Sequence, residues 1–307
     1  MTEIHSDNLV SSFYFLFKLC GRLSFSVVEV KRSITVKAPA KVNLRLEILG
    51  LREDHYHEIL SWVYPVSLWD EISLERIEEG IEFECDHLQV PREDLTVKAA
   101  KLFLQYTGLK MGVRIRLKKN IPVGSGLGGG SSDAASTLRG LIGLSGLHLR
   151  EEELLELGAK LGSDVPFFIR GKPALIGGRG EKIIRELPPL KLFMVIIYPQ
   201  KPLSSSAVYH LYDLSLTKED RKNKIVRDFP PRKWDDFLYN ALEQVAEEVL
   251  PEIKEMKNLL RQKGAQGVSM TGSGSAVFGI YEREEEARSA FDFLKTFNWE
   301  VFLVETL

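Results

Sequence analysis

The sequence predicts an α+β protein made of two domains. Strand-like alternation and helix-like spacing of apolar residues follow one another along the chain. With 307 residues the chain is long enough for two cores. After residue 180 the predicted order strand–helix–helix–strand–helix–strand is typical of a compact half with an antiparallel sheet. We therefore expect domains at 33–180 and 181–307, preceded by an extension at 1–32.

The first half begins with strands. Apolar residues at 42, 44, 46 and 48 predict one strand, and alternation resumes over 59–74 after a polar turn at 50–57. Helical spacing of apolar residues predicts helices at 97–106, from 134 onward, and at 151–161. Gly162 is expected to end the last of these helices. Alternation at 113–118 predicts a further strand.

The second half opens with a turn at 177–180 and a buried strand at 193–198 that Pro199 stops. Helices are expected at 234–250 and 252–263, divided by Pro251. A strand at 276–281, a helix at 284–295 and a strand at 301–304 complete the chain.

Composition narrows the class of protein. The chain is 44% hydrophobic and 27% charged, as in ordinary globular proteins. A net charge of −2 without a Lys/Arg block argues against nucleic acid as a partner. Cys20 and Cys85 make no disulfide framework or zinc spacing, which favours a reducing cytoplasm.

The apolar run at 13–17 is too short to cross a bilayer, so no membrane span is expected. Glu3 and Asp7 replace the basic start of a secretory signal. Three interpretations of this N-terminal region remain: a strand, a short interfacial segment, or an extension that results from a misassigned start codon. We expect residues 1–32 to be dispensable for chemistry.

A glycine loop between the strand at 113–118 and the following helix is the most informative segment. Its five glycines leave backbone N–H groups accessible, and a helix N-terminus attracts anions. Ser131 or Ser132 is expected to cap the helix and to reach a Mg²⁺ ion. The loop predicts a nucleotide phosphate site comprising Pro122, Gly124, Ser125, Gly126, Leu127, Gly128, Gly129, Gly130, Ser131 and Ser132.

Other nucleotide motifs do not fit this loop. A Rossmann fold requires an acidic residue after a second strand, but residues 146–157 predict a helix. The Gly-Lys-Ser/Thr of a Walker A loop and the signature motifs of protein kinases are absent. A flexible turn is the remaining structural alternative.

Further segments are candidates for the site, and each has a structural alternative. Lys41 and Asn43 share a strand face, so their ammonium and amide groups could point into a common cleft. Taken alone, this face is better explained as an ordinary solvated strand face. Asp164 follows a helix end beside apolar residues, so a base and a turn former are equally good interpretations.

The loop aromatics His55, Tyr56 and His57, and Tyr209 after a serine run, either stack on a base or have structural roles. The second glycine stretch at 271–275 either approaches the first loop or a substrate closely, or forms a hairpin turn.

The order of these segments resembles the GHMP kinase superfamily, which includes galactokinase, homoserine kinase and mevalonate kinase. The resemblance rests on Pro-Ala-Lys-Val-Asn-Leu at 39–44, the glycine loop, Ser-Asp-Val-Pro-Phe-Phe at 163–168 and the stretch at 271–275. It runs from about residue 34 to the end. Two details sharpen the resemblance: Tyr56-His57-Glu58 follows closely after the segment at 39–44, and Leu-Gly-Ser-Asp-Val-Pro-Phe-Phe at 161–168 follows the glycine loop. Together they resemble the branch of the superfamily that phosphorylates a cytidylated alcohol in non-mevalonate isoprenoid synthesis.

The resemblance implies a ribosomal-protein-S5-like first domain and a ferredoxin-like second domain. It implies ATP as co-substrate with Mg²⁺ and a small cytidyl substrate. A monomer or a homodimer is expected. Lys41 would be the catalytic lysine and Asp164 the general base. The implied substrate contacts are Asn43, Tyr56, His57, Ser205, Tyr209, Thr271, Gly272 and Ser273.

One position departs from the family pattern, which has glycine where this chain has His55. If the position requires a positive φ, histidine there is strained by about 1–2 kcal/mol. Otherwise the loop differs in conformation. A homoserine or mevalonate-type kinase and a catalytically silent nucleotide-binding module are the alternative functions.

Overall fold

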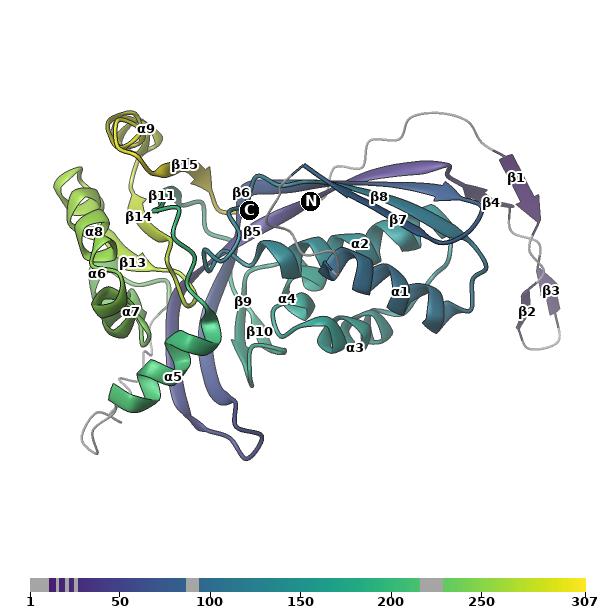
Figure 1. Ribbon diagram of the computed structural model, residues 1–307, viewed down its shortest axis with the longest axis horizontal. Helices are drawn as coiled ribbons and strands as arrows, with labels where there is room; N and C mark the ends of the chain where they lie inside the picture. The colour runs from purple at the N-terminus through teal and green to yellow at the C-terminus, as the bar shows by residue number, and fades with distance from the viewer. Residues whose placement is uncertain (1–10, 15–16, 20–21, 25–26, 87–93, 216–228) are drawn as a thin grey trace. The chain divides into compact units, whose positions relative to one another are not determined.

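The computed structural model describes residues 11–14, 17–19, 22–24, 27–86, 94–215 and 229–307 (Figure 1). The chain forms two compact units from interleaved segments. Unit 1 contains Met1–Ala38, Asp70–Lys119 and Gly130–Ile169, and unit 2 contains Pro39–Trp69, Asn120–Gly129 and Arg170–Leu307. The long strands β5 (Ser33–Leu51) and β6 (His57–Ile77) each contribute to both. A domain boundary near residue 180 stays a prediction.

Unit 1 is a sheet with helices on one side. The later part of β6 pairs antiparallel with β8 (Gly112–Lys118), which pairs parallel with β7 (Ile81–Cys85). The helices α1 (Leu95–Thr107), α2 (Gly129–Ser145), α3 (Glu151–Leu161) and α4 (Val165–Arg170) lie on one side of these strands (Figure 1). The expected strand at 113–118 and helices at 97–106 and 151–161 are confirmed.

Helix α2 packs closely on the sheet because its inward face is small and apolar. Ala134, Ala135 and Leu138 are fully buried. A Cβ at Gly140 would lie only 2.5 Å from Leu74 Cδ1 of β6, so glycine permits this approach.

The expected cap of α2 is wrong. The helix begins at Gly129, so Ser131 and Ser132 lie within its first turn. Gly128, with a φ of 75°, turns the chain into the helix. Glycine can adopt that conformation without the strain that a Cβ imposes.

Unit 2 contains the expected antiparallel sheet, in the order β13 (Gly267–Met270), β14 (Val277–Tyr281), β11 (Phe193–Tyr198), β15 (Glu300–Glu305). Helices α8 (Glu252–Gln262) and α9 (Glu284–Leu294) pack on it through an apolar core (Figure 1). Separately, the first part of β6 pairs with β9 (Ala174–Gly177), which pairs with β10 (Lys182–Glu186). Helix α5 (Ser205–Ser215) follows β11.

The single helix expected at 234–250 is also wrong. The segment forms a short helix α6 (Trp234–Phe237), a two-residue strand β12 (Tyr239–Asn240) and helix α7 (Glu243–Val249). Strand β12 pairs in parallel with Arg45 and Leu46 of β5. Tertiary pairing thus overrides the local helical pattern, which carried no signal for a distant strand partner.

The described residues of the N-terminal segment form four short strands. β1 (Ser11–Tyr14) pairs with β4 (Val27–Val30), and β2 (Phe17–Leu19) pairs with β3 (Arg22–Ser24). Cys20 and residues 1–10 lie outside the described residues, and the dispensability of 1–32 stays a prediction. No helix in the described part of the chain has the length and apolarity needed to span a bilayer.

Candidate active site

The polar face of β5 in unit 2 is buried. Lys41, Asn43, Arg45 and Glu47 expose only 4–5% of their surface. The interpretation of this face as solvated is therefore wrong. Burial of charged and amide side chains is costly unless they are paired, so the contacts of this row define its role.

Lys41 and Asn43 belong to one hydrogen-bonded network with Thr271. The Lys41 ammonium donates to Asn43 Oδ1. Thr271 Oγ1 accepts the Asn43 backbone N–H at 3.0 Å and donates to Asn43 Oδ1 at 3.3 Å. Asn43 Nδ2 donates to Ser61 Oγ at 2.8 Å. The network orients the amide and keeps the ammonium beside the second glycine stretch.

The two glycine stretches approach each other backbone to backbone. A Cβ at Gly126 would lie 2.1 Å from the Thr271 carbonyl oxygen, and one at Gly272 would lie 2.8 Å from the Gly126 oxygen. The Ala276 N–H donates to Ser125 O at 3.0 Å. Residues 271–275 also connect the antiparallel strands Gly267–Met270 and Val277–Tyr281, so the segment is both a hairpin turn and a close backbone neighbour of the first loop. Glycine is required on both sides of this contact.

Asn240 was missed by the sequence analysis. Its Nδ2 donates to the carbonyl oxygens of Met270 and Gly272, each at 2.8 Å, and its Oδ1 accepts the Leu242 N–H at 3.0 Å. Asn240 therefore braces the second glycine stretch. Its one sequence signal was a weak helix former inside an expected helix.

The first turn of α2 suits an anion. The first four N–H groups of a helix have no intrahelical acceptor. Ser132 is the fourth residue of this helix, and its Oγ is buried without a hydrogen-bond partner among the described residues. These donors fit phosphate oxygens, and a serine hydroxyl fits a hard cation such as Mg²⁺. Within the described residues, no group of three His, Cys, Asp or Glu side chains could hold a metal.

Asp164 lies in unit 1, in the turn between α3 and α4. Its carbonyl oxygen accepts the Phe168 N–H at 3.4 Å, and its side chain is half-buried. Val165, Phe167 and Phe168 behind it are buried, as expected for a carboxylate at the edge of an apolar region. In the same unit, Ser131 Oγ lies 3.7 Å from the position that a Cβ on Gly162 would occupy.

His57 and Tyr209 come together in unit 2. Their rings stack with centroids 4.9 Å apart, and His57 Nε2 lies 2.7 Å from Asp213 Oδ1. Ser205 Oγ on α5 lies 2.7 Å from Ser273 Oγ, which links this helix to the second glycine stretch. Tyr56 makes a different contact. It is 55% exposed, and the Arg179 guanidinium lies 4.6 Å from the centroid of its ring.

His55 adopts the left-handed conformation, with a φ of 62°. The position thus requires the backbone that glycine provides most easily. We expect His55→Gly to raise the free energy of unfolding by about 1 kcal/mol, because relief of strain exceeds the added entropy of the unfolded chain. Urea titration measures this change. The control Glu53→Gly in the same turn should be destabilising, and an equal loss in both variants would contradict the strain.

Glu58 ties the β5–β6 hairpin to the turn after β9. Its carboxylate accepts from Arg52 at 2.5 Å and from the Gly178 N–H at 3.0 Å. The hydrogen bond from Arg52 is the main reason that the pKa of Glu58 is lowered. A lowered pKa stabilises the fold above the unfolded value, about 4.3, and that contribution disappears as the pH falls through the folded value.

We therefore expect Glu58→Gln to lower stability at pH 7 and to have little effect at pH 3. The loss at pH 7 should be at most about 1 kcal/mol, because solvent screens this half-exposed pair. Thermal unfolding at both pH values measures it, with Glu53→Gln as the control. A loss that is the same at both pH values would show that the carboxylate charge is irrelevant.

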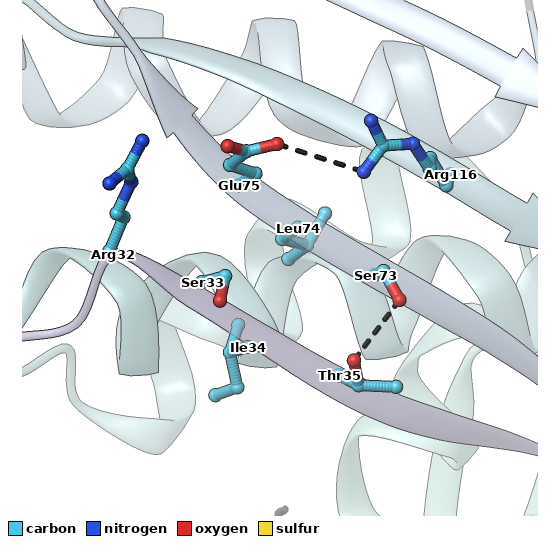
Figure 2. A pocket seen from close by; sticks show the side chains of 8 residues that line it. All are labelled: Arg32, Ser33, Ile34, Thr35, Ser73, Leu74, Glu75 and Arg116. Carbon is cyan, nitrogen blue, oxygen red and sulfur yellow. Dashed lines mark hydrogen bonds and ion pairs between the residues drawn. The ribbon is translucent and has the colours of Figure 1, made fainter. Parts of the chain in front are cut away.

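A pocket of about 310 Å³ in unit 1 contains none of these residues (Figure 2). It lies on the strand face where Thr35 and Ser73 share a hydrogen bond of 3.0 Å. Arg116 and Glu75 within it form an ion pair of 3.6 Å (Figure 2). The pocket therefore lies apart from the predicted site residues of unit 1.

Comparisons with known proteins agree with the motif series. The model described as GHMP kinases N terminal domain matches residues 94–172, and the model described as GHMP kinases C terminal matches 231–299. A homoserine kinase from Cytophaga hutchinsonii aligns with a TM-score of 0.68 at 19% identity, over 90% of this chain and 95% of that chain, which supports the fold. The fold and the two family models define a two-domain GHMP kinase, an ATP-dependent small-molecule kinase.

Relatives with higher identity share one name. A 4-diphosphocytidyl-2-C-methyl-D-erythritol kinase from Syntrophus aciditrophicus is 40% identical over 89% of this chain and 99% of its own. One from Geobacter metallireducens is 42% identical over 90% and 99%. A crystal structure of 4-(cytidine 5'-diphospho)-2C-methyl-D-erythritol kinase aligns with a TM-score of 0.76 at 35% identity, over 89% and 98%. The chain belongs to the 4-diphosphocytidyl-2-C-methyl-D-erythritol kinase family.

Proposed function

We propose that this protein phosphorylates the 2-hydroxyl group of 4-diphosphocytidyl-2-C-methyl-D-erythritol with ATP, a step of non-mevalonate isoprenoid precursor synthesis. The observation that carries the proposal is the identity of about 40% with curated kinases of that name over nearly their whole length. The buried Lys41–Asn43–Thr271 network supports the proposal. Burial of a charged and an amide side chain is costly, so a strand face with only a structural role would be expected to leave them in solvent.

In this proposal Asp164 accepts the proton of the attacking hydroxyl group. Lys41 stabilises the negative charge that develops on the transferred phosphoryl group. Asn43 and Thr271 orient the lysine and the acceptor. Phosphoryl transfer demands little covalent chemistry from the protein, so alignment and charge stabilisation supply most of the rate.

The glycine loop and the first turn of α2 would hold the ATP phosphates, and Ser131 or Ser132 would contact Mg²⁺. A bound Mg²⁺ would neutralise charge on the β- and γ-phosphates. The orphaned Ser132 hydroxyl supports this assignment.

His57, Tyr56 and Tyr209 would recognise the cytosine, with Gly272, Ser273 and Ser205 lining the acceptor site. The stacked pair of His57 and Tyr209 supports a site for a planar base. We propose a cytoplasmic protein, monomeric or homodimeric, that acts on small molecules and has no nucleic-acid or membrane partner.

The test is an ATP-consumption assay with the cytidyl substrate, homoserine and mevalonate in parallel. The proposal predicts turnover of the cytidyl substrate, with kcat/KM at least about a hundredfold above the other two, because a buried site built for polar contacts rejects analogues that lack them. Preference for homoserine or mevalonate would assign another GHMP kinase activity. If the protein is folded and binds ATP but turns over none of the three substrates, it is a catalytically silent nucleotide-binding module.

A further inference from the structure

A buried ion cluster in unit 1 consists of Lys119, Asp70 and Asp133. The Lys119 ammonium donates to a carboxylate oxygen of Asp70 and to Asp133 Oδ2, the latter at 2.7 Å. The exposed fractions of the three side chains are 4%, 0% and 1%. Three ionisable groups this deeply buried require one another, because an unpaired charge in the interior is strongly unfavourable.

The cluster follows from the strand register and the helix start. Glu71 of β6 lies opposite Lys118 of β8, which places Asp70 and Lys119 together just beyond the paired ends. Asp133 is the fifth residue of α2. Its carboxylate therefore reaches back from the helix to Lys119, the residue that follows the last residue of β8.

Lys119 and Asp133 stand at the two ends of the glycine loop. The chain leaves unit 1 after Lys119, continues through 120–129, and returns at Gly130. The ion pair between residues 119 and 133 thus closes the loop at its base. Asp70 belongs to β6 and is outside the loop, although it contacts the same ammonium.

Glycines make this loop costly to order. Gly124, Gly126 and Gly128 all have positive φ values, and glycine loses more conformational freedom than any other residue when it is fixed. A tie at the base of the loop reduces the entropy that nucleotide binding must remove, because the ends are already held together.

The charge balance suits this role. Neighbouring carboxylates keep the pKa of Lys119 raised even though burial acts against it. Burial and the nearby Asp70 raise the pKa of Asp133, while Lys119 opposes that rise. Lys119 therefore stays protonated and can donate to both oxygens.

We propose that Lys119 and Asp133 are positioning residues that close the base of the glycine loop and pre-order it for the phosphates of a nucleotide. The inference rests on the proposed role of this loop in ATP binding. Neither side chain is required to touch the nucleotide. Their contribution is to the cost of ordering the loop, so it should appear in nucleotide affinity and in loop protection.

The cluster offers a matched pair of variants, Asp133→Ala and Asp70→Ala. Each removes one carboxylate and leaves Lys119 paired with the other, so both should fold with comparable loss of stability, checked by thermal unfolding. Only Asp133→Ala opens the base of the loop. The measurements are hydrogen exchange of the amides at 120–132 without nucleotide, affinity for a non-hydrolysable ATP analogue with Mg²⁺, and steady-state kinetics.

We expect Asp133→Ala to weaken analogue binding and to raise the KM for ATP about tenfold, the cost of fixing one further backbone residue. The KM for the acceptor should stay within about twofold, and the loop amides should exchange faster than in Asp70→Ala. Equal effects of the two variants on exchange and affinity, or no effect of Asp133→Ala, would overturn the inference.

The proposed function and this inference can be refuted separately. If the wild-type protein binds the analogue but does not turn over the cytidyl substrate, the substrate assignment is wrong. Faster loop exchange and weaker analogue binding in Asp133→Ala would support the closure of the loop even then.

Discussion

Replacing Asp164 with asparagine is expected to lower kcat by about 10²–10⁴-fold, the usual contribution of a positioned general base. Asparagine has nearly the same size but cannot accept the proton of the acceptor hydroxyl. Binding of ATP does not depend on that proton, so the KM for ATP should change by less than about threefold. Steady-state kinetics with the cytidyl substrate measure both constants.

A matched control is Glu156→Gln on the exposed face of α3, which makes the same chemical change in the same unit. It should leave kcat within about twofold of the wild type. Near-normal turnover of Asp164→Asn would exclude this residue as the base. A large rise in the KM for ATP with unchanged kcat would assign it to nucleotide binding instead.

Gly126→Ala is expected to have the second largest effect. The residue has a φ of 81°, and a Cβ there would lie 2.1 Å from the Thr271 carbonyl oxygen. Left-handed strain and overpacking together should lower the free energy of unfolding by about 2–5 kcal/mol. The two glycine stretches must then separate, so the KM for ATP should rise about a hundredfold or more.

Gly130→Ala is the control at a glycine in the first turn of helix α2, directly after the loop. A Cβ at Gly130 would meet only Leu95 Cδ1 at 3.6 Å, an ordinary contact, inside helix α2 where alanine is favourable. We expect its stability to equal or exceed that of the wild type. Denaturant titration and ATP kinetics of both variants separate the backbone approach at Gly126 from a general effect of an added methyl group.

Local pattern was sufficient for most of the elements, and the resemblance of the motif series to a known superfamily indicated the class of enzyme. The bounds of α3 and β11 agree with the predicted residues, because strong periodicity and clear end signals such as Gly162 and Pro199 coincide there. The glycine loop and the order of motifs were enough to indicate a GHMP kinase, which the family models confirm.

Local pattern failed where distant segments decide the conformation. Strand β12 interrupts an expected helix because Tyr239 and Asn240 pair with β5, almost two hundred residues earlier. The start of α2 was misplaced because three consecutive glycines allow the helix to begin before the serines. The sequence left two alternatives for residue 55, a strained histidine with a positive φ or a loop of different conformation. The structure shows the positive φ, which is set by the geometry of the hairpin.

By itself the sequence determined the order of most elements, the glycine content of the loop and the residue types proposed for phosphoryl transfer. It did so because periodicity, glycine content and motif spacing are local properties of the chain. Only the tertiary structure decided that the polar row of β5 is buried, that Thr271 contacts it, that Asn240 braces the second glycine stretch, and that Lys119 joins Asp70 to Asp133. Burial and pairing depend on segments far apart in the chain, and the energy of a charged or amide group depends on both.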